Sequence, residues 1–245
     1  MNIYAHRGNS GFYPENTMYA FKKSLDLDIY GIELDVHKTK DGVIVVHHDE
    51  TVDRLFDGQG AIKKMTFDQI KDLTLKDEEF KDNPECKIST LEDVLIMLEP
   101  TKINLNIELK NDKVSYKKLE EDVIALIKKY NMEKRVLISS FNHKSLKKCK
   151  KINSKIQTGY LLDAAKLKRK NFKKVFKIAK DCNCSYIHPS YDIVDKEFVN
   201  EAHKKGFLVQ VYTVNSITIM KKLIKLKVDG VFTNYPKIIN TIVND

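Results

Sequence analysis

Two apolar segments of the sequence carry acidic side chains at alternate positions. Residues 31–37 read Gly-Ile-Glu-Leu-Asp-Val-His, and residues 104–110 read Asn-Leu-Asn-Ile-Glu-Leu-Lys. Successive side chains of a strand point to opposite faces, so Glu33 and Asp35 share one face and Glu108 lies on the matching face of the second segment. Burying these groups is costly unless something compensates them. Oxygen donors without Cys or His predict a hard divalent cation, Mg2+ first and Ca2+ as the alternative, rather than zinc.

Basic residues near these carboxylates limit the reactions that the site could catalyse. Lys110 shares the face of Glu108. Glu33 and Asp35 could form a purely structural salt bridge with Lys110 as partner, although the same polar face on two segments favours a cation site. His6 ends one apolar run, and His48 follows another. Paired histidines that titrate near neutral pH could donate and accept protons. The planar fork of Arg7 suits a phosphate, and Lys110 would add a point charge.

This combination indicates phosphoryl transfer more than other hydrolytic reactions. A cation, an arginine, a lysine and two histidines can neutralise a phosphodiester and move protons. A glycosidase would need only a carboxylate pair at a set separation. An acyl hydrolase would need a nucleophile elbow such as G-x-S-x-G, which the sequence lacks.

The predicted secondary structure would bring these residues to one end of a barrel. Strand candidates lie at 3–6, 31–39, 43–47, 104–110, 136–141, 157–162, 186–189, 208–213 and 230–233. Helical patterns occupy 17–27, with Asn16 as a possible N-cap, and 91–98, 116–130, 145–152, 172–181, 196–205 and 217–226. About eight strand–helix repeats in this length favour an α/β fold, a closed (β/α)8 TIM barrel.

One polar stretch interrupts the alternation. Residues 49–89 are rich in Gly, Asp and Lys and are too long for an ordinary barrel loop. We expect a small insertion after the second strand, with a short helix at 67–73, and long ordered insertions tend to cover sites. The whole chain, 1–245, is expected to form a single domain that contains this insertion.

Composition excludes several other classes of protein. The chain has 245 residues, 43 Lys+Arg against 34 Asp+Glu, and a net charge of +9. The lysines follow helical spacing, which predicts solvated helix faces and no nucleic-acid partner. No apolar run approaches the ~20 residues of a membrane span, and the first residues do not resemble a secretory signal. The four cysteines lack framework spacing, which predicts free thiols and a cytoplasmic location.

The sequence resembles the glycerophosphodiester phosphodiesterases over nearly its whole length. The matching motifs are His6-Arg7-Gly8, Pro14-Glu15-Asn16-Thr17, residues 31–36, 39–42 and 45–49, Asp53-Arg54, Glu108-Leu109-Lys110, Tyr212-Thr213-Val214-Asn215 and residues 229–236. The combined N-terminal motifs are specific. The family commonly has Trp at the position of Tyr212 and Asp at that of Asn234.

The resemblance implies a role for each matched residue. Hydrolysis of glycerophosphodiesters, such as glycerophosphocholine or glycerophosphoethanolamine, would yield glycerol 3-phosphate and an alcohol. The implied metal ligands are Glu33, Asp35 and Glu108. The implied general acid/base pair is His6 and His48. The implied phosphate and substrate contacts are Arg7, Lys110 and Glu15, with Phe141 and Tyr212 as plausible apolar walls.

Two other functions remain open from the sequence. A lysophospholipase D-like enzyme could use the same residues on acylated substrates. A non-enzymatic basic protein could bind anionic polymers through its lysines, although such a protein would not need inward-facing carboxylates. Among the other histidines, His37 and His47 are expected to be structural, and His188 could reach the barrel mouth.

Overall fold

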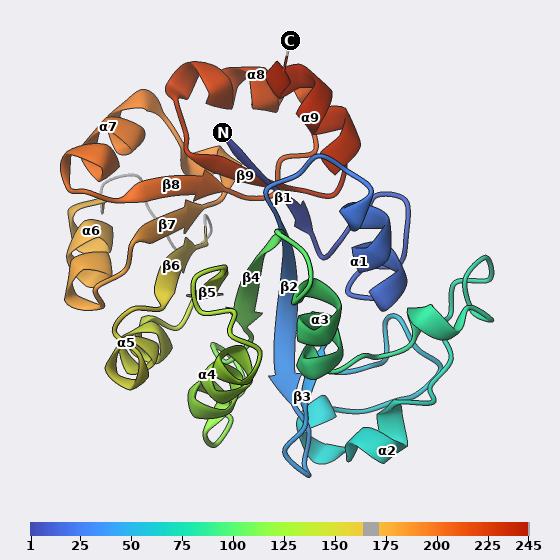
Figure 1. Cartoon of the computed structure of the whole chain (residues 1–245). Helices are drawn as coiled ribbons and strands as arrows, with labels where there is room; N and C mark the ends of the chain where they lie inside the picture. Colours follow the sequence, from blue (N-terminus) through green and yellow to red (C-terminus); the bar gives the residue numbers. More distant parts are fainter. Residues whose placement is uncertain (164–171, 245) are drawn as a thin grey trace.

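The chain folds around a closed barrel of parallel strands, as the sequence predicted (Figure 1). The structure is a computed structural model and describes residues 1–163 and 172–244. The strands follow the order β1-β9-β8-β7-β6-β5-β4-β2, and pairing of β1 with β2 closes the ring. The barrel strands are β1 (Asn2–His6), β2 (Gly31–Lys38), β4 (Asn104–Leu109), β5 (Val136–Ser140), β6 (Gln157–Leu162), β7 (Tyr186–Pro189), β8 (Leu208–Val211) and β9 (Gly230–Thr233).

One further strand lies outside the barrel. β3 (Ile44–Val46) runs antiparallel to β2, with Val46 opposite Val36. The apolar run at 43–47 is therefore an edge strand that folds back on β2. Its end places His48 beside the carboxyl end of β2, because His47 donates its backbone N–H to the carbonyl of Asp35.

Helices cover the outer face of the barrel (Figure 1). They are α1 (Met18–Leu25), α3 (Leu91–Leu98), α4 (Leu119–Lys129), α5 (His143–Ile152), α6 (Phe172–Asp181), α7 (Lys196–Lys204), α8 (Ile217–Leu226) and α9 (Pro236–Asn244). The outward side chains of β2, Ile32, Leu34 and Val36, are fully buried in the apolar layer beneath these helices. The alternation predicted for β2 is thus confirmed. α9 was not predicted, although Pro236 at its first position is a known start signal.

The segment 49–89 forms a small apolar cluster of its own beside β3. It contains the short elements η1 (Ile62–Lys64), α2 (Phe67–Ile70) and η2 (Pro84–Cys86). The buried members of the cluster are Val45, Val52, Phe56, Ile62, Ile70, Leu75, Cys86 and Ile88. The helix expected at 67–73 ends at Ile70. Figure 1 shows this segment to one side of the barrel, next to α1 and α3.

The structure also tests the expectations about membrane spans and cysteines. Within the described ranges, no helix is both long enough and apolar enough to cross a bilayer. The four cysteines, Cys86, Cys149, Cys182 and Cys184, are buried free thiols, as predicted. A 3-10 turn, η4 (Tyr191–Ile193), follows β7.

Candidate active site

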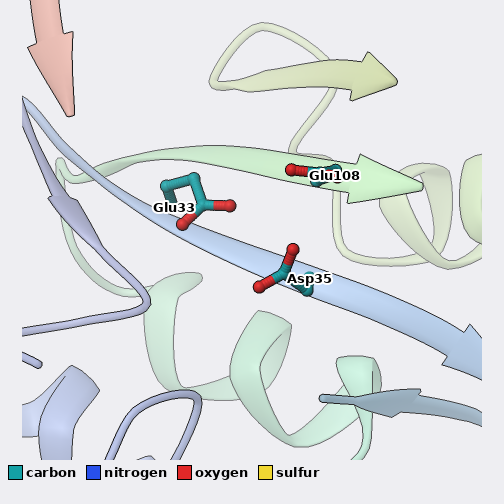
Figure 2. A group of neighbouring side chains, drawn as sticks. All are labelled: Glu33, Asp35 and Glu108. Carbon is teal, nitrogen blue, oxygen red and sulfur yellow. The ribbon is translucent and has the colours of Figure 1, made fainter. Parts of the chain in front are cut away.

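Two buried carboxylates and one half-buried carboxylate meet inside the barrel, near the carboxyl ends of β2 and β4 (Figure 2). Glu33 and Asp35 project inward from β2, and Glu108 projects from β4, where it pairs with Asp35 in register. Glu33 and Asp35 are 3% and 1% exposed. Each residue offers an oxygen within 4.8 Å of the others. The structure therefore brings together the acidic residues that the strand patterns predicted.

Cations and an amide compensate Asp35 in particular. Its carboxylate lies 3.3 Å from Arg7 Nε and 3.5 Å from Lys110 Nζ. Asn16 Nδ2 donates a hydrogen bond of 2.9 Å to it. Burial alone would raise the pKa of Asp35, but Lys110 and Arg7 hold this pKa well below its usual range. Asp35 is therefore ionised.

The other two carboxyl groups are less well compensated. Burial, together with the charges of Asp35 and Glu108, raises the pKa of Glu33 well above its usual value. Burial raises the pKa of Glu108 to about 7, although Lys110 lies 2.9 Å away and opposes this shift. The cluster thus holds more negative charge than its protein neighbours can neutralise.

An excess of negative charge over the neighbouring positive charges is typical of a cation site. Oxygen donors from Glu33, Asp35 and Glu108 are close enough to share one ion, and Mg2+ and Ca2+ prefer such ligands. Burial and the repulsion between the carboxylates raise the two pKa values, and a divalent cation would offset both effects. The residues present therefore fit a hard divalent cation.

Arg7 reaches this cluster because the chain turns sharply after β1. Arg7 has φ 56 and Gly8 has φ 80, both in the left-handed region. The turn directs the backbone N–H of Arg7 to Glu33 Oε2 at 2.9 Å. A side chain at position 8 would meet the backbone of Ala20 at 2.8 Å, so only glycine fits there.

His6 ends β1 and faces the carboxylates. Its Nδ1 lies 2.7 Å from Asn234 Oδ1, and its Nε2 lies 3.9 Å from Glu33 Oε2. Because an amide oxygen accepts, Nδ1 carries the proton and Nε2 is left as the basic nitrogen. Burial, with the charge of Arg7, lowers the pKa of His6 to about 4. His6 is therefore neutral at pH 7.

His48 is oriented by an acidic neighbour. Its Nδ1 lies 2.7 Å from Asp49 Oδ1. Burial lowers the pKa of His48, whereas the carboxylates of Asp35 and Asp49 work against this shift. A proton on His48 thus gains support from Asp49, which His6 lacks at its own Nδ1.

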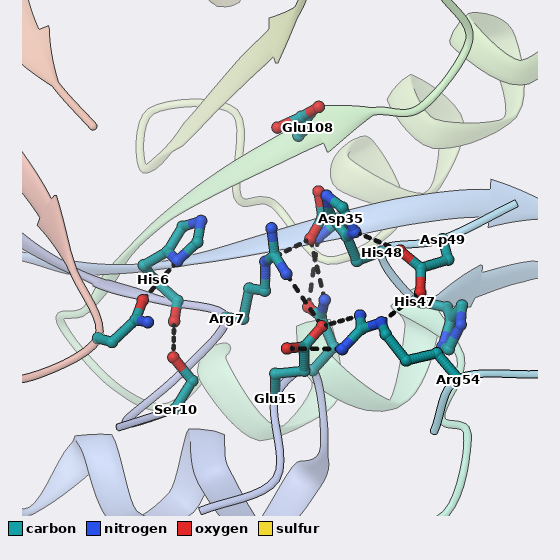
Figure 3. Close-up of polar contacts among 12 residues, drawn as sticks. His6, Arg7, Ser10, Glu15, Asp35, His47, His48, Asp49, Arg54 and Glu108 are labelled. Atoms are coloured by element: carbon teal, nitrogen blue, oxygen red, sulfur yellow. Dashed lines mark hydrogen bonds and ion pairs between the residues drawn. The ribbon is translucent and has the colours of Figure 1, made fainter. Parts of the chain in front are cut away.

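A chain of ion pairs joins the two sides of the site (Figure 3). Arg7 Nη1 donates to Glu15 Oε1 at 2.9 Å, and Arg54 Nη2 donates to the same oxygen at 2.6 Å. Arg54 Nε also donates to Asp49 Oδ2 at 2.5 Å. Arg54, from the segment 49–89, therefore connects the Arg7 side with the carboxylate that orients His48.

These groups line a cavity of about 130 Å3. Its walls include His6, Arg7, Glu33, His48, Glu108, Lys110, Phe141, His188 and Tyr212. The rings of Phe141 and Tyr212 pack edge to face, with centroids 6.2 Å apart. The Tyr212 hydroxyl donates to the carbonyl of Leu162, so its ring is what faces the cavity as an apolar wall.

The remaining histidines of this region are held by other groups. His37 contacts the Tyr116 hydroxyl at Nδ1 and the His48 carbonyl at Nε2. His47 contacts the carbonyl of Thr51, inside the neighbouring apolar cluster. Both therefore pack structurally, as expected.

Several contacts escaped the sequence analysis. Asn234 and Asp49 orient the two histidines, and Arg54 bridges the site. Asn16 does not cap α1, which was expected of it, because Thr17 accepts the cap bond from Ala20 N. Asn16 instead has φ 58, which turns its side chain toward Asp35. The family motifs contain all of these positions but do not state their contacts.

We expect the Arg54→Ala variant to lose about tenfold in kcat, with a smaller change in KM, because Asp49 and Glu15 lose their shared partner. Steady-state kinetics on a phosphodiester substrate would measure both constants. Lys113→Ala is the matched control, since it removes an exposed lysine paired with Glu50 3.1 Å away. A wild-type kcat for Arg54→Ala would show that the bridge does not position the site.

TIM barrels carry their chemistry at the carboxyl ends of the strands, and this end combines oxygen ligands with groups suited to phosphate and protons. The fold and the site define a phosphodiester hydrolase of the (β/α)8 class. A sequence model of the glycerophosphoryl diester phosphodiesterase family matches residues 6–238. The chain belongs to this family and is a glycerophosphodiester phosphodiesterase.

Individual relatives agree with this assignment. The chain is 38% identical to a glycerophosphodiester phosphodiesterase of Caldanaerobacter subterraneus, over 99% of this chain and 96% of the relative. An Oleispira antarctica phosphodiesterase, solved with the product sn-glycerol-3-phosphate, is 28% identical with a TM-score of 0.85, covering 100% of this chain and 97% of that one. A solved Agrobacterium tumefaciens structure, 24% identical with a TM-score of 0.91 and coverage of 100% and 97%, shows the same fold.

Proposed function

We propose that this enzyme hydrolyses glycerophosphodiesters such as glycerophosphocholine and glycerophosphoethanolamine to glycerol 3-phosphate and the free alcohol, with a divalent cation. The observation that carries the proposal is the single cavity that joins the carboxylates to His6, His48, Arg7 and Lys110. The glycerol 3-phosphate bound to the Oleispira relative favours the same product here.

The charges of the cavity suit a phosphodiester anion. Arg7 and Lys110 would hold its oxygens, and Glu33, Asp35 and Glu108 would hold the cation, with Mg2+ favoured over Ca2+. When bound, the cation would supply Lewis-acid stabilisation of the charge that develops on phosphorus oxygens. Phe141 and Tyr212 would enclose the apolar parts of the substrate. Glu15 would act by holding Arg7 in place.

The two histidines would divide the proton transfers. His6 is neutral with a basic Nε2, which suits removal of a proton from the attacking hydroxyl, either water or the glycerol 2-OH. His48 has Asp49 at Nδ1, which supports the protonated ring and suits donation to the departing alcohol oxygen. As the new P–O bond forms, the bond to the alcohol breaks, and the alcohol leaves with a proton. Attack by water gives glycerol 3-phosphate directly, whereas attack by the glycerol 2-OH gives a cyclic phosphodiester that a water molecule must then open to glycerol 3-phosphate.

A substrate panel tests the proposal directly. Purified enzyme would be incubated with glycerophosphocholine, glycerophosphoethanolamine and lysophosphatidylcholine, after chelation and with Mg2+, Ca2+ or Mn2+ added back. Coupled detection would follow glycerol 3-phosphate. We expect activity on the first two substrates that disappears with chelator and returns with metal. A wild type that is inert on both glycerophosphodiesters with every ion would contradict the proposal.

Metal affinity should depend on pH in a definite direction. Glu33 and Glu108 have raised pKa values, about 7 for Glu108, so protons compete with the cation at lower pH. We expect the affinity for Mg2+ or Mn2+ to weaken by about tenfold per pH unit below pH 7, with about one proton released per ion bound. Titration calorimetry in two buffers of different ionisation enthalpy measures both. An affinity that is equal at pH 6 and pH 8 would show that both carboxyl groups are already ionised.

A further inference from the structure

The positive charge of the chain is concentrated in its C-terminal part. Residues 1–140 contain 21 Lys+Arg and 26 Asp+Glu, a net charge of −5, whereas residues 141–245 contain 22 Lys+Arg and 8 Asp+Glu, a net charge of +14. α5 and α6, which lie side by side on the outer face of the barrel (Figure 1), carry nine of these lysines and one carboxylate, Asp181. Surfaces that serve only solubility usually intersperse both signs of charge, so this concentration indicates a surface that meets an anion.

The lysines of these two helices differ in whether they have an acidic partner. Lys148, on the side of α5 that faces α4, forms ion pairs with Glu120 at 2.9 Å and with Glu121 at 2.8 Å. Lys177 pairs with Asp181 at 2.8 Å. Six fully exposed lysines form no ion pair among the described residues, and we call them the lysine face: Lys144, Lys147, Lys151, Lys173, Lys174 and Lys180. The protein therefore leaves uncompensated positive charge on this side of the barrel.

A groove of about 370 Å3 runs between α5 and α6. Its α5 side includes Lys144, Lys147 and Lys151, whose spacing of three and four residues puts their side chains on one face of the helix. On the α6 side, Asp181 is the one carboxylate that lines the groove among the described residues, and Lys177 already neutralises it. The groove is therefore a concave surface with an excess of positive charge, which suits the phosphate of a lipid headgroup.

The residue types on this face favour an anionic bilayer over a nucleic acid. α5 and α6 contain no arginine, whose planar fork reads base edges and grips single phosphates. Their phenylalanine rings are not free to stack on bases, because Phe172 and Phe176 pack against Phe198 with centroids 4.9 and 5.5 Å apart. Lysine charges suit a diffuse anionic surface, and clusters of about four to eight basic residues on an amphipathic helix are typical of sites for acidic phospholipids.

We propose that the lysine face docks this enzyme on membranes that contain anionic phospholipids, with headgroup phosphates held along the groove between α5 and α6. Neither helix exposes a large apolar side chain, so the attachment is electrostatic and reversible rather than an insertion among the acyl chains. The lysine face lies on the outer side of the barrel, whereas the cavity lies inside it, so docking leaves the cavity open. The inference does not depend on which phosphodiester the enzyme hydrolyses.

Sedimentation with vesicles measures the docking directly. The full chain would be mixed with vesicles of phosphatidylglycerol and phosphatidylcholine in equal parts, and with vesicles of phosphatidylcholine alone. We expect binding to the anionic vesicles only, and loss of this binding when the salt is raised from about 0.05 M to about 0.5 M, because salt screens exposed charges. Equal binding to the two kinds of vesicle, or binding that persists at the higher salt, would overturn the proposal.

Two double variants locate the docking surface. In Lys147→Gln/Lys151→Gln we expect the affinity for anionic vesicles to fall about 30-fold, because each lysine near an anionic surface contributes a factor of about five. Lys221→Gln/Lys225→Gln on α8, at another side of the barrel (Figure 1), is the matched control. Its two lysines are also exposed, four residues apart and without an ion pair in the described structure, and we expect a change of less than about threefold. Both variants should keep the wild-type circular dichroism spectrum and the wild-type rate on a soluble phosphodiester.

The remaining outcomes separate a lipid surface from other anions. A single-stranded RNA of about 20 nucleotides that binds more tightly than the anionic vesicles at the same salt concentration would assign the lysine face to nucleic acid and overturn the proposal. Equal losses in the two double variants would show that only the net charge matters, and a wild type that does not bind anionic vesicles would also contradict the docking. Each of these results leaves the proposed function standing, because the substrate panel tests it separately.

Discussion

The His6→Gln and His48→Gln variants are each expected to lower kcat/KM for glycerophosphocholine by about three orders of magnitude, because each removes a group that moves a proton in the transition state. The two losses should differ on bis(p-nitrophenyl) phosphate. Its nitrophenol leaves without a proton, so His48→Gln should be impaired far less on this substrate than on glycerophosphocholine. His6→Gln should be impaired on both, since the attacking hydroxyl still needs a base.

His47→Gln is the control for this experiment. His47 is adjacent to His48 but contacts the carbonyl of Thr51 and the ring of Phe56. Its substitution should affect stability and leave kcat within about twofold of the wild type, as for a group outside the cavity. Stopped assays of all variants at matched folded concentration give the comparison. A His6→Gln variant with the full rate would contradict the assigned pair.

The Glu33→Gln variant is expected to lose metal binding and to lower kcat/KM about 1000-fold or more, while becoming more stable without metal. Burial and the neighbouring carboxylates raise the pKa of Glu33, so its charged form destabilises the fold above that pKa. Removing the charge should raise the free energy of unfolding by about 1–2 kcal/mol at pH 8. Urea denaturation in chelator measures this change.

Asp35→Asn is the matched variant, and we expect it to change the free energy of unfolding in the opposite direction. Asp35 has a lowered pKa because Lys110 and Arg7 face it, so its charge stabilises the fold. Neutralising it leaves both cations without their main counter-charge, and we expect a loss of about 3 kcal/mol. Both variants should fail to bind the cation. If both shifted the free energy of unfolding in the same direction, this account of the charges would be wrong.

The parts of the fold that local sequence determines were predicted correctly. The alternation of apolar and polar side chains in β2 placed Glu33 and Asp35 on the inner face, since a strand has a period of two. The same reasoning placed Glu108 next to them. Regular alternation of strands and helices then predicted the closed barrel, in which β2 and β4 lie side by side.

The parts that depend on distant contacts could not be predicted in this way. His6 and Asn234 are 228 positions apart, and only the pairing of β1 with β9 brings them together. Arg54 reaches Glu15 and Asp49 through a segment without regular periodicity. The motifs identified the positions, but the contacts follow from the closed barrel.

Closure of the barrel between β1 and β9 also determines when this enzyme can begin to act. The imidazole of His6 is made early in synthesis, but the amide that orients it belongs to Asn234, after β9. A nascent chain still on the ribosome therefore lacks an assembled centre, however much of its barrel has formed. Catalytic competence should therefore arrive in one late step.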